Sequence, residues 1–167
     1  KKGSYNIYGD YPVYTTIATK TIFDGGRFIN EADIQNKRKV CVIGERTQKE
    51  LFKEGESPIG KFIRINTIYF RIVGVSRFIA GGGFDDDGDI YIPFTTYQKL
   101  YNTGEYVDFL LIAAYDDADI VKVETDIRAI LKELHHVSPE DKRALGAFNL
   151  GEMFNQITKF ASGMTFL

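Results

Sequence analysis

This sequence has little cysteine, a small net charge and no long apolar run. Cys41 is the only cysteine among 167 residues, so no disulfide can form within the chain. The formal net charge is only -2 and the charges are interspersed, which argues against a nucleic-acid partner. No run approaches the roughly 18 apolar residues of a membrane span. The start, KKGSYNIYGD, lacks an initiator Met and the apolar stretch of a signal peptide, so we expect a segment of a longer protein.

What the sequence does contain is material for a packed core. It is 44% hydrophobic and 26% charged, which suits one ordinary domain or two small ones. Cys41 lies in the apolar run VCVIG, where we interpret it as a small buried side chain and not as a reactive thiol.

The first two thirds of the chain are rich in short β-branched and aromatic runs bounded by Gly, Asn, Pro and Asp, the pattern typical of strands. FIRI and IYFRIVGV flank Asn66 and Thr67, which indicates a hairpin. Short helices are predicted over 45–52 and from Thr95, as N-cap, to about Tyr101. The predicted strands are Val13 to Ile17, Thr21 to Phe23, Lys39 to Ile43, Phe62 to Asn66, Tyr69 to Val75 and Asp89 to Ile92.

The pattern changes beyond Gly104. VDFLLIAAY, residues 107–115, is a continuous apolar run that predicts a buried strand. An amphipathic helix over 120–134 follows, capped by the acids at 116–119 and with Glu124 and Arg128 spaced to pair. A last strand over 145–148 would complete a β-α-β tail.

Two motifs resemble ligand sites but fail in detail. GESPIGKF, residues 55–62, has the spacing of a phosphate loop, yet Phe62 replaces the magnesium-binding Ser or Thr and a strand follows it. We interpret it as a turn. In GGGFDDDGDIYIPF, residues 81–94, an EF-hand register starting at Asp85 places Ile90 and Thr96 where Gly and Glu are needed. We therefore expect a mobile, metal-free loop over 80–88 with solvated aspartates.

No residues are assigned to catalysis, to a cofactor or to a metal. His135 and His136 are adjacent, point about 100° apart on a helix, and cannot share a metal as an i,i+4 pair can. Phe78, Ile79 and Phe84 flank the glycine-rich stretch and are candidate partner contacts, with burial in the core as the alternative.

Five segments taken in order resemble the periplasmic core domain of MacB-type ABC transporter permeases, within the superfamily that includes FtsX-like and lipoprotein-releasing permeases. They are GGRFINEAD (25–33), KVCVIGERTQKELF (39–52), SPIGKFIRIN (57–66), FRIVGV (70–75) and DIYIPF (89–94).

The resemblance implies an extracytoplasmic, non-catalytic domain of an inner-membrane protein, in the periplasm or extracellular space. It would couple ATP hydrolysis across the membrane to export or mechanical work. The implied partners are a second permease protomer, an ATP-binding subunit or domain and a periplasmic adaptor protein, with no cofactor.

The implied fold class is α+β, with a strand-rich outer subdomain over 1–105 and a partial β-α-β, porter-like, membrane-proximal subdomain over 106–150. Residues 151–167 would form a helix leading toward a membrane span, with Asn149 and Glu152 at its start. Family members carry another β-α-β half before the first residues seen here. Without it, we expect the apolar strand to be left unpaired and prone to association.

Two other functions stay open from the residues alone. One is a calcium-stabilised extracellular binding module built on the aspartates. The other is a hydrolase assembled from scattered acids, for which the sequence offers no positive support.

Overall fold

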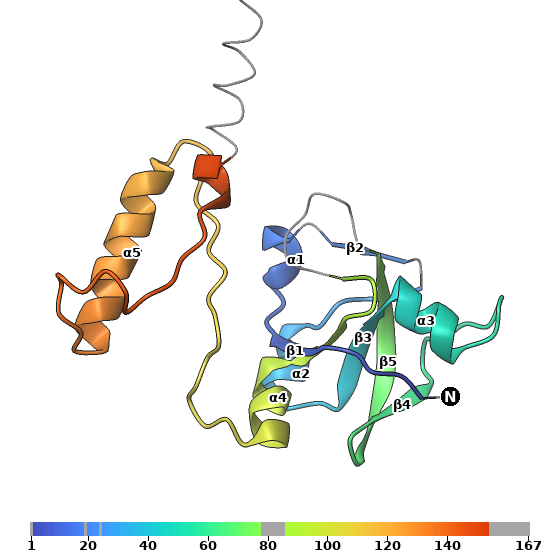
Figure 1. Cartoon of the computed structure of the whole chain (residues 1–167). Helices are drawn as coiled ribbons and strands as arrows, with labels where there is room; N and C mark the ends of the chain where they lie inside the picture. Colours follow the sequence, from blue (N-terminus) through green and yellow to red (C-terminus); the bar gives the residue numbers. More distant parts are fainter. Residues whose placement is uncertain (1, 19, 24, 78–85, 154–167) are drawn as a thin grey trace, which may run out of the picture. The chain divides into compact units, whose positions relative to one another are not determined.

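The computed structural model describes residues 2–18, 20–23, 25–77 and 86–153, which fall into two compact units, Lys1–Leu111 and Ile112–Leu167 (Figure 1). The first unit is built on a six-stranded mixed sheet in the order β1-β6-β3-β5-β2, with β4 paired to β5. Its strands are β1 Ile7–Asp10, β2 Thr21–Ile22, β3 Val40–Gly44, β4 Phe62–Ile65, β5 Ile68–Arg77 and β6 Ile90–Pro93.

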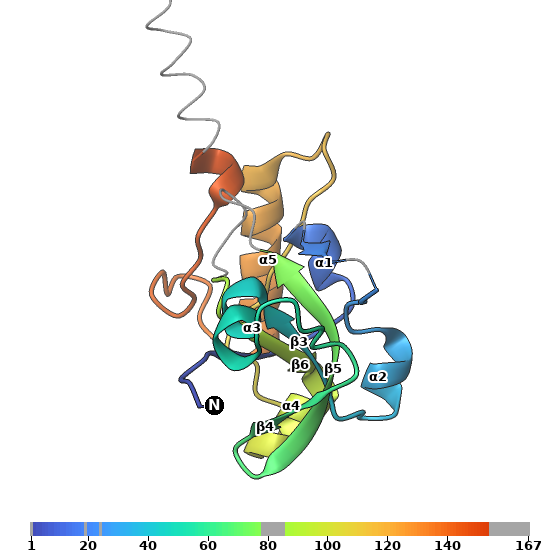
Figure 2. The same cartoon turned by 90° about the vertical axis from the view of Figure 1, so that its right-hand side faces the viewer.

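Strand alternation divides the core between the two faces of the sheet. Cys41 and Ile43 of β3 belong to one apolar cluster, while Val42 between them belongs to a second. Tyr91 of β6 joins that second cluster. Helix α2 (Glu31–Gln35) and helix α3 (Glu45–Leu51) lie on opposite sides of the sheet (Figure 2). Both faces are therefore covered, which explains why all of β3 and β6 is buried.

The α+β fold class predicted from the sequence is confirmed, as are most strands and the hairpin. Strands β4 and β5 pair antiparallel across Asn66 and Thr67, and Asn66 takes the left-handed conformation that such a tight turn needs (φ 54°). GESPIGKF is a turn as predicted, with Gly60 at φ 82°.

Two local predictions in this unit are wrong. Residues 14–17 form helix α1 (Tyr14–Ile17) and not a strand, because the chain turns at Pro12 and Tyr14 packs between Phe28 and Tyr91. Thr95 does not cap α4 (Phe94–Tyr101); it lies in the first turn, where its hydroxyl donates to the carbonyl of Ile34 at 2.6 Å and ties α4 to α2.

The second unit contains one long helix, α5 (Ile120–Leu134), as predicted. Asp119 caps it by accepting hydrogen bonds from the backbone N–H groups of Val121 and Lys122. The strands predicted over 107–115 and 145–148 do not form: neither stretch pairs with another strand within the described residues. At the end of the described chain, residues 150–153 begin a helical turn, and the predicted cap is present because Glu152 N–H donates to Asn149.

Candidate functional site

The candidate partner contacts Phe78, Ile79 and Phe84 lie outside the described residues, so their role stays a prediction. The structure does define where the preceding strand ends. Arg77, the last residue of β5, donates to Glu45 of α3 (Nε to Oε2, 3.0 Å) and lies 4.7 Å from the ring centroid of Phe23. These contacts hold the end of β5 beside α3.

The described aspartates of the glycine-rich stretch form a tight turn. Asp86 accepts from Gly88 N–H at 2.7 Å and pairs with Arg46 at 2.5 Å. Asp89 is only 1% exposed; its carboxylate accepts from Asp86 N–H at 2.6 Å and from the amide of Asn6 at 3.2 Å. The expectation that these aspartates stay solvated is wrong for Asp89, because its carboxylate is buried and accepts hydrogen bonds from Asp86 and Asn6.

Helix α3 holds this turn through its first residues. Thr47 donates to the carbonyl of Gly88 at 2.8 Å, and Arg46 N–H donates to that of Asp87 at 3.0 Å. A Cβ atom on Gly44 would lie 1.9 Å from the Asp87 oxygen, so only glycine allows this approach. The acids thus have structural roles, and the described part of the chain holds no group of three His, Cys, Asp or Glu side chains placed for a metal ion.

A second buried carboxylate, Asp33, fixes the start of α2. It is 0% exposed and accepts two hydrogen bonds from Arg27, at 2.6 and 3.1 Å, and one from Asn30 N–H, which forms a capping box with it. Burial alone would raise the pKa of Asp33, but the hydrogen bonds from Arg27 and Asn30 outweigh it and hold the pKa below its ordinary value. The spacing of Asn30 and Asp33 in the sequence is a signal from which this cap can be predicted.

The main exposed feature is the extended apolar segment 106–115. Tyr106 and Tyr115 at its ends are 85% and 87% exposed, and the large side chains between them are mostly exposed as well. Leu111 is the exception, because it packs against the second core cluster. Such a concentration of exposed apolar side chains indicates a contact surface for another polypeptide.

Helix α5 has the same character. No residue of α5 is buried in the described chain, and Val121, Ile130 and Leu134 are more than half exposed. An amphipathic helix ordinarily covers its apolar face with a neighbour. The second unit therefore lacks a core of its own in the described residues, and its apolar groups are available for docking.

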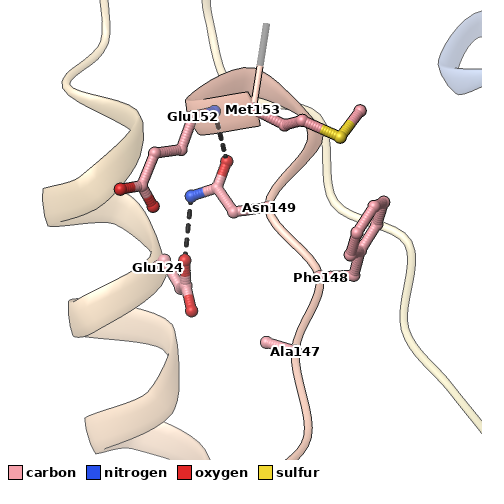
Figure 3. Close-up of a pocket in the computed structure, with 6 residues that line it drawn as sticks. All are labelled: Glu124, Ala147, Phe148, Asn149, Glu152 and Met153. Atoms are coloured by element: carbon pink, nitrogen blue, oxygen red, sulfur yellow. Dashed lines mark hydrogen bonds between the residues drawn. The ribbon is translucent and has the colours of Figure 1, made fainter. Parts of the chain in front are cut away.

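Hydrogen bonds hold the end of this unit against α5, beside a small depression of about 260 Å³ (Figure 3). Asn149 donates to Glu124 at 2.8 Å, and Arg128 bonds both Glu124 and the carbonyl of Leu145, also at 2.8 Å. The hydrogen bonds from Asn149 and Arg128 lower the pKa of Glu124. These groups tie residues 145–149 to α5, and the predicted pairing of Glu124 with Arg128 is confirmed.

The remaining candidates from the sequence are structural. Cys41 is fully buried, and burial raises the pKa of its thiol, as expected for an unreactive core cysteine. His135 ends α5 as its C-cap and His136 follows with φ 54°, so the two residues terminate the helix.

Comparison with known proteins adds the family. The MacB-like periplasmic core domain family matches residues 1–130. The chain is 31% identical, over its whole length, to the macrolide export ATP-binding/permease protein MacB of Bdellovibrio bacteriovorus, covering 26% of that protein. It is 34% identical over 66% of its length to the pyoverdine export ATP-binding/permease protein PvdT of Pseudomonas syringae, covering 17% of that protein.

A solved structure of a related periplasmic region shares the fold of this chain. The periplasmic region of MacB from Actinobacillus actinomycetemcomitans superimposes with a TM-score of 0.64 at 25% identity, over 80% of this chain and 58% of that one. The chain thus spans about a quarter or less of the curated relatives. In the described residues, no helix has the length and apolar character needed to cross a membrane. The match over residues 1–130 and the shared fold establish that the chain belongs to the MacB-like periplasmic core domain family of ABC transporter permeases.

Proposed function

We propose that this chain is the extracytoplasmic part of a permease that couples ATP hydrolysis on the other side of the membrane to export or mechanical work. The observation that carries the proposal is the family match over residues 1–130, with a macrolide export ATP-binding/permease relative aligned over the whole chain. The domain itself is non-catalytic, and the ATPase belongs to a separate domain or subunit. The working contacts are then made by surfaces and not by a catalytic centre.

The exposed apolar groups support a role in assembly. Most of segment 106–115 is exposed, and no residue of α5 is fully buried within the described chain. The solved periplasmic region of the relative is longer than the part that this chain matches. The proposed arrangement is an outer subdomain over 1–105 and a membrane-proximal subdomain over 106–150 that a β-α-β half elsewhere in the parent protein completes. Residues 151–167 would lead toward the membrane.

The partners in this proposal are a second permease protomer, an ATP-binding domain or subunit and a periplasmic adaptor. The parent would reside in the inner membrane, with this domain in the periplasm or outside the cell. The relatives' names, which join an ATP-binding part to a permease part, support this assignment.

The test uses both the parent protein and the isolated chain. In the chain, Phe109, Leu110 and Ile112 are each at least half exposed, so replacing all three with Ser should leave its thermal melting within a few degrees of the wild type. In the parent, reconstituted in lipid vesicles, the same variant should lose transport because the completing subdomain can no longer pack on the segment. Matched Ser replacements at exposed Tyr11 and Val13 of the first unit are the control.

Transport by the triple Ser variant equal to that of the wild type would contradict the assembly role. A parent sequence without membrane helices on either side of this segment would overturn the permease assignment itself.

A further inference from the structure

The β4–β5 hairpin has two very different faces. Ile63, Ile65 and Phe70 point to the core on one face and belong to the first apolar cluster. The other face is formed by the residues that alternate with them, because side chains along a strand point to opposite sides in turn. The hairpin turn lies at the end of β5 away from β2, which pairs with Ser76 and Arg77 (Figure 1).

Two cross-strand pairs make up that second face. Phe62 lies opposite Arg71, and Arg64 lies opposite Tyr69. Directly opposite residues of an antiparallel pair share a face, so the four side chains lie together with arginine and aromatic residues alternating in both directions. The rings of Phe62 and Tyr69 are 62% and 61% exposed, and both arginines are exposed as well. We call these four residues the arginine–aromatic face.

The two arginines have no carboxylate partner among the described residues, unlike several other arginines of the chain. Arg27, Arg46 and Arg77 each pair with a carboxylate. Within the described ranges, neither Arg64 nor Arg71 forms an ion pair, and residues 61–77 contain no Asp or Glu. The face is therefore a local excess of positive charge on a chain whose net charge is negative.

A depression of about 390 Å³ adjoins this face at Arg71. Ile59, Ile72 and Val73 contribute apolar lining, and glycines at 25, 26 and 60 leave it open. A Cβ atom at Gly60 would lie 3.7 Å from the Nη2 atom of Arg71, which places the guanidinium at the rim. The depression is large enough for one apolar side chain held next to a positive charge.

We propose that the arginine–aromatic face binds an acidic polypeptide segment of a partner protein, with its carboxylates on Arg64 and Arg71 and one apolar side chain in the depression. Planar guanidinium groups suit carboxylates because they can donate two parallel hydrogen bonds. The flanking rings exclude water on one side and strengthen those contacts. The depression favours a polypeptide side chain over a flat lipid surface. The proposal stands apart from the transport function, because it depends only on the hairpin and the depression beside it.

The test measures binding of a fluorescein-labelled decapeptide with four Glu and one Leu to the 167-residue chain by fluorescence anisotropy. The double variant Arg64→Gln/Arg71→Gln should weaken binding about tenfold, because two charge-assisted contacts are lost. The control Lys142→Gln/Arg143→Gln removes the same charge from exposed positions of the second unit and should change affinity less than about twofold. Replacing the peptide's Leu with Ser should weaken binding to the wild type.

Amide chemical shifts of the ¹⁵N-labelled chain, recorded with and without the peptide, show where it binds and whether each variant is folded. Changes concentrated in 59–73, lost in the arginine variant, support the proposal. Equal weakening by both double variants, or no peptide binding at all, overturns it. Binding of anionic phosphatidylglycerol vesicles but not of the peptide would also overturn it, in favour of a membrane contact.

Discussion

Replacing Asp33 with Asn tests whether the clamp at the start of α2 stabilises the first unit. Both carboxylate oxygens of Asp33 face donors: Oδ2 accepts from Arg27 and Asn30, and Oδ1 accepts from Arg27 with Arg38 3.5 Å away. An Asn side chain must turn its NH₂ group toward one of these donors, so at least one buried hydrogen bond is lost with the charge. We expect a loss of about 2–4 kcal/mol in the free energy of unfolding, at the lower end because Arg27 is 40% exposed and can be hydrated.

The assay is urea unfolding of Asp33→Asn against Glu31→Gln, which removes an exposed charge from the same helix and should cost less than about 0.5 kcal/mol. The pH dependence gives a second readout. Because the folded-state pKa is lowered, the stabilisation is present above the ordinary pKa of 3.8 and is lost as pH falls through the folded value. The stability difference between the wild type and Asp33→Asn should therefore shrink as the pH falls from 3.8 through the lower folded-state pKa of Asp33. A difference under about 1 kcal/mol at neutral pH would refute the reasoning.

Three further outcomes follow from the same contacts. Gly44→Ala should destabilise the first unit by about 3 kcal/mol in urea unfolding, since its new methyl group would overlap the Asp87 carbonyl. Gly146→Ala, with no atom near its added Cβ, should be neutral, and equal costs would contradict the contact. Cys41 should resist iodoacetamide in the native chain at pH 8 and react in urea; native labelling would mean that β3 opens. Millimolar calcium should leave the melting temperature unchanged relative to chelator, because Asp86 and Asp89 are already held by protein donors; a rise of several degrees would restore the calcium-stabilised module.

The sheet of the first unit could be predicted from sequence because its strands carry local signals. The β-branched runs around Val42 and Ile72 and the turn at Asn66 mark strand and turn without reference to distant residues. The structural role of Asp89 could not be predicted in this way. Its burial depends on Asn6, 83 residues earlier, and on α3, which holds the neighbouring turn. Acids in a glycine-rich stretch indicate a loop, but the contacts that bury one of them arise from the fold.

The arginine–aromatic face could be predicted only in part. Once the hairpin is assumed, counting outward from Asn66 and Thr67 places Arg64 opposite Tyr69 and Phe62 opposite Arg71. The sequence also contains no acid between residues 61 and 77. The face was therefore within reach of sequence reasoning, but the depression beside Arg71 was not. It forms where the glycines at 25 and 26 meet residues 59 and 60 beside β5, which are distant in sequence.

The strand predicted over 107–115 does not form, although its side chains are those of a buried strand. An apolar run indicates a preference for burial, but it does not by itself indicate a paired strand. The run VDFLLIAAY consists of side chains that favour burial. Most of them are exposed here, with Tyr115 87% exposed, and this exposure makes the run a strong candidate for a contact surface. A strand, however, also needs hydrogen-bond partners for its backbone, and composition cannot say whether the chain supplies them. Within the described residues no strand lies beside it. The segment thus has the side chains of a buried strand without its neighbours, which is the condition expected of one half of an interface that another polypeptide segment completes.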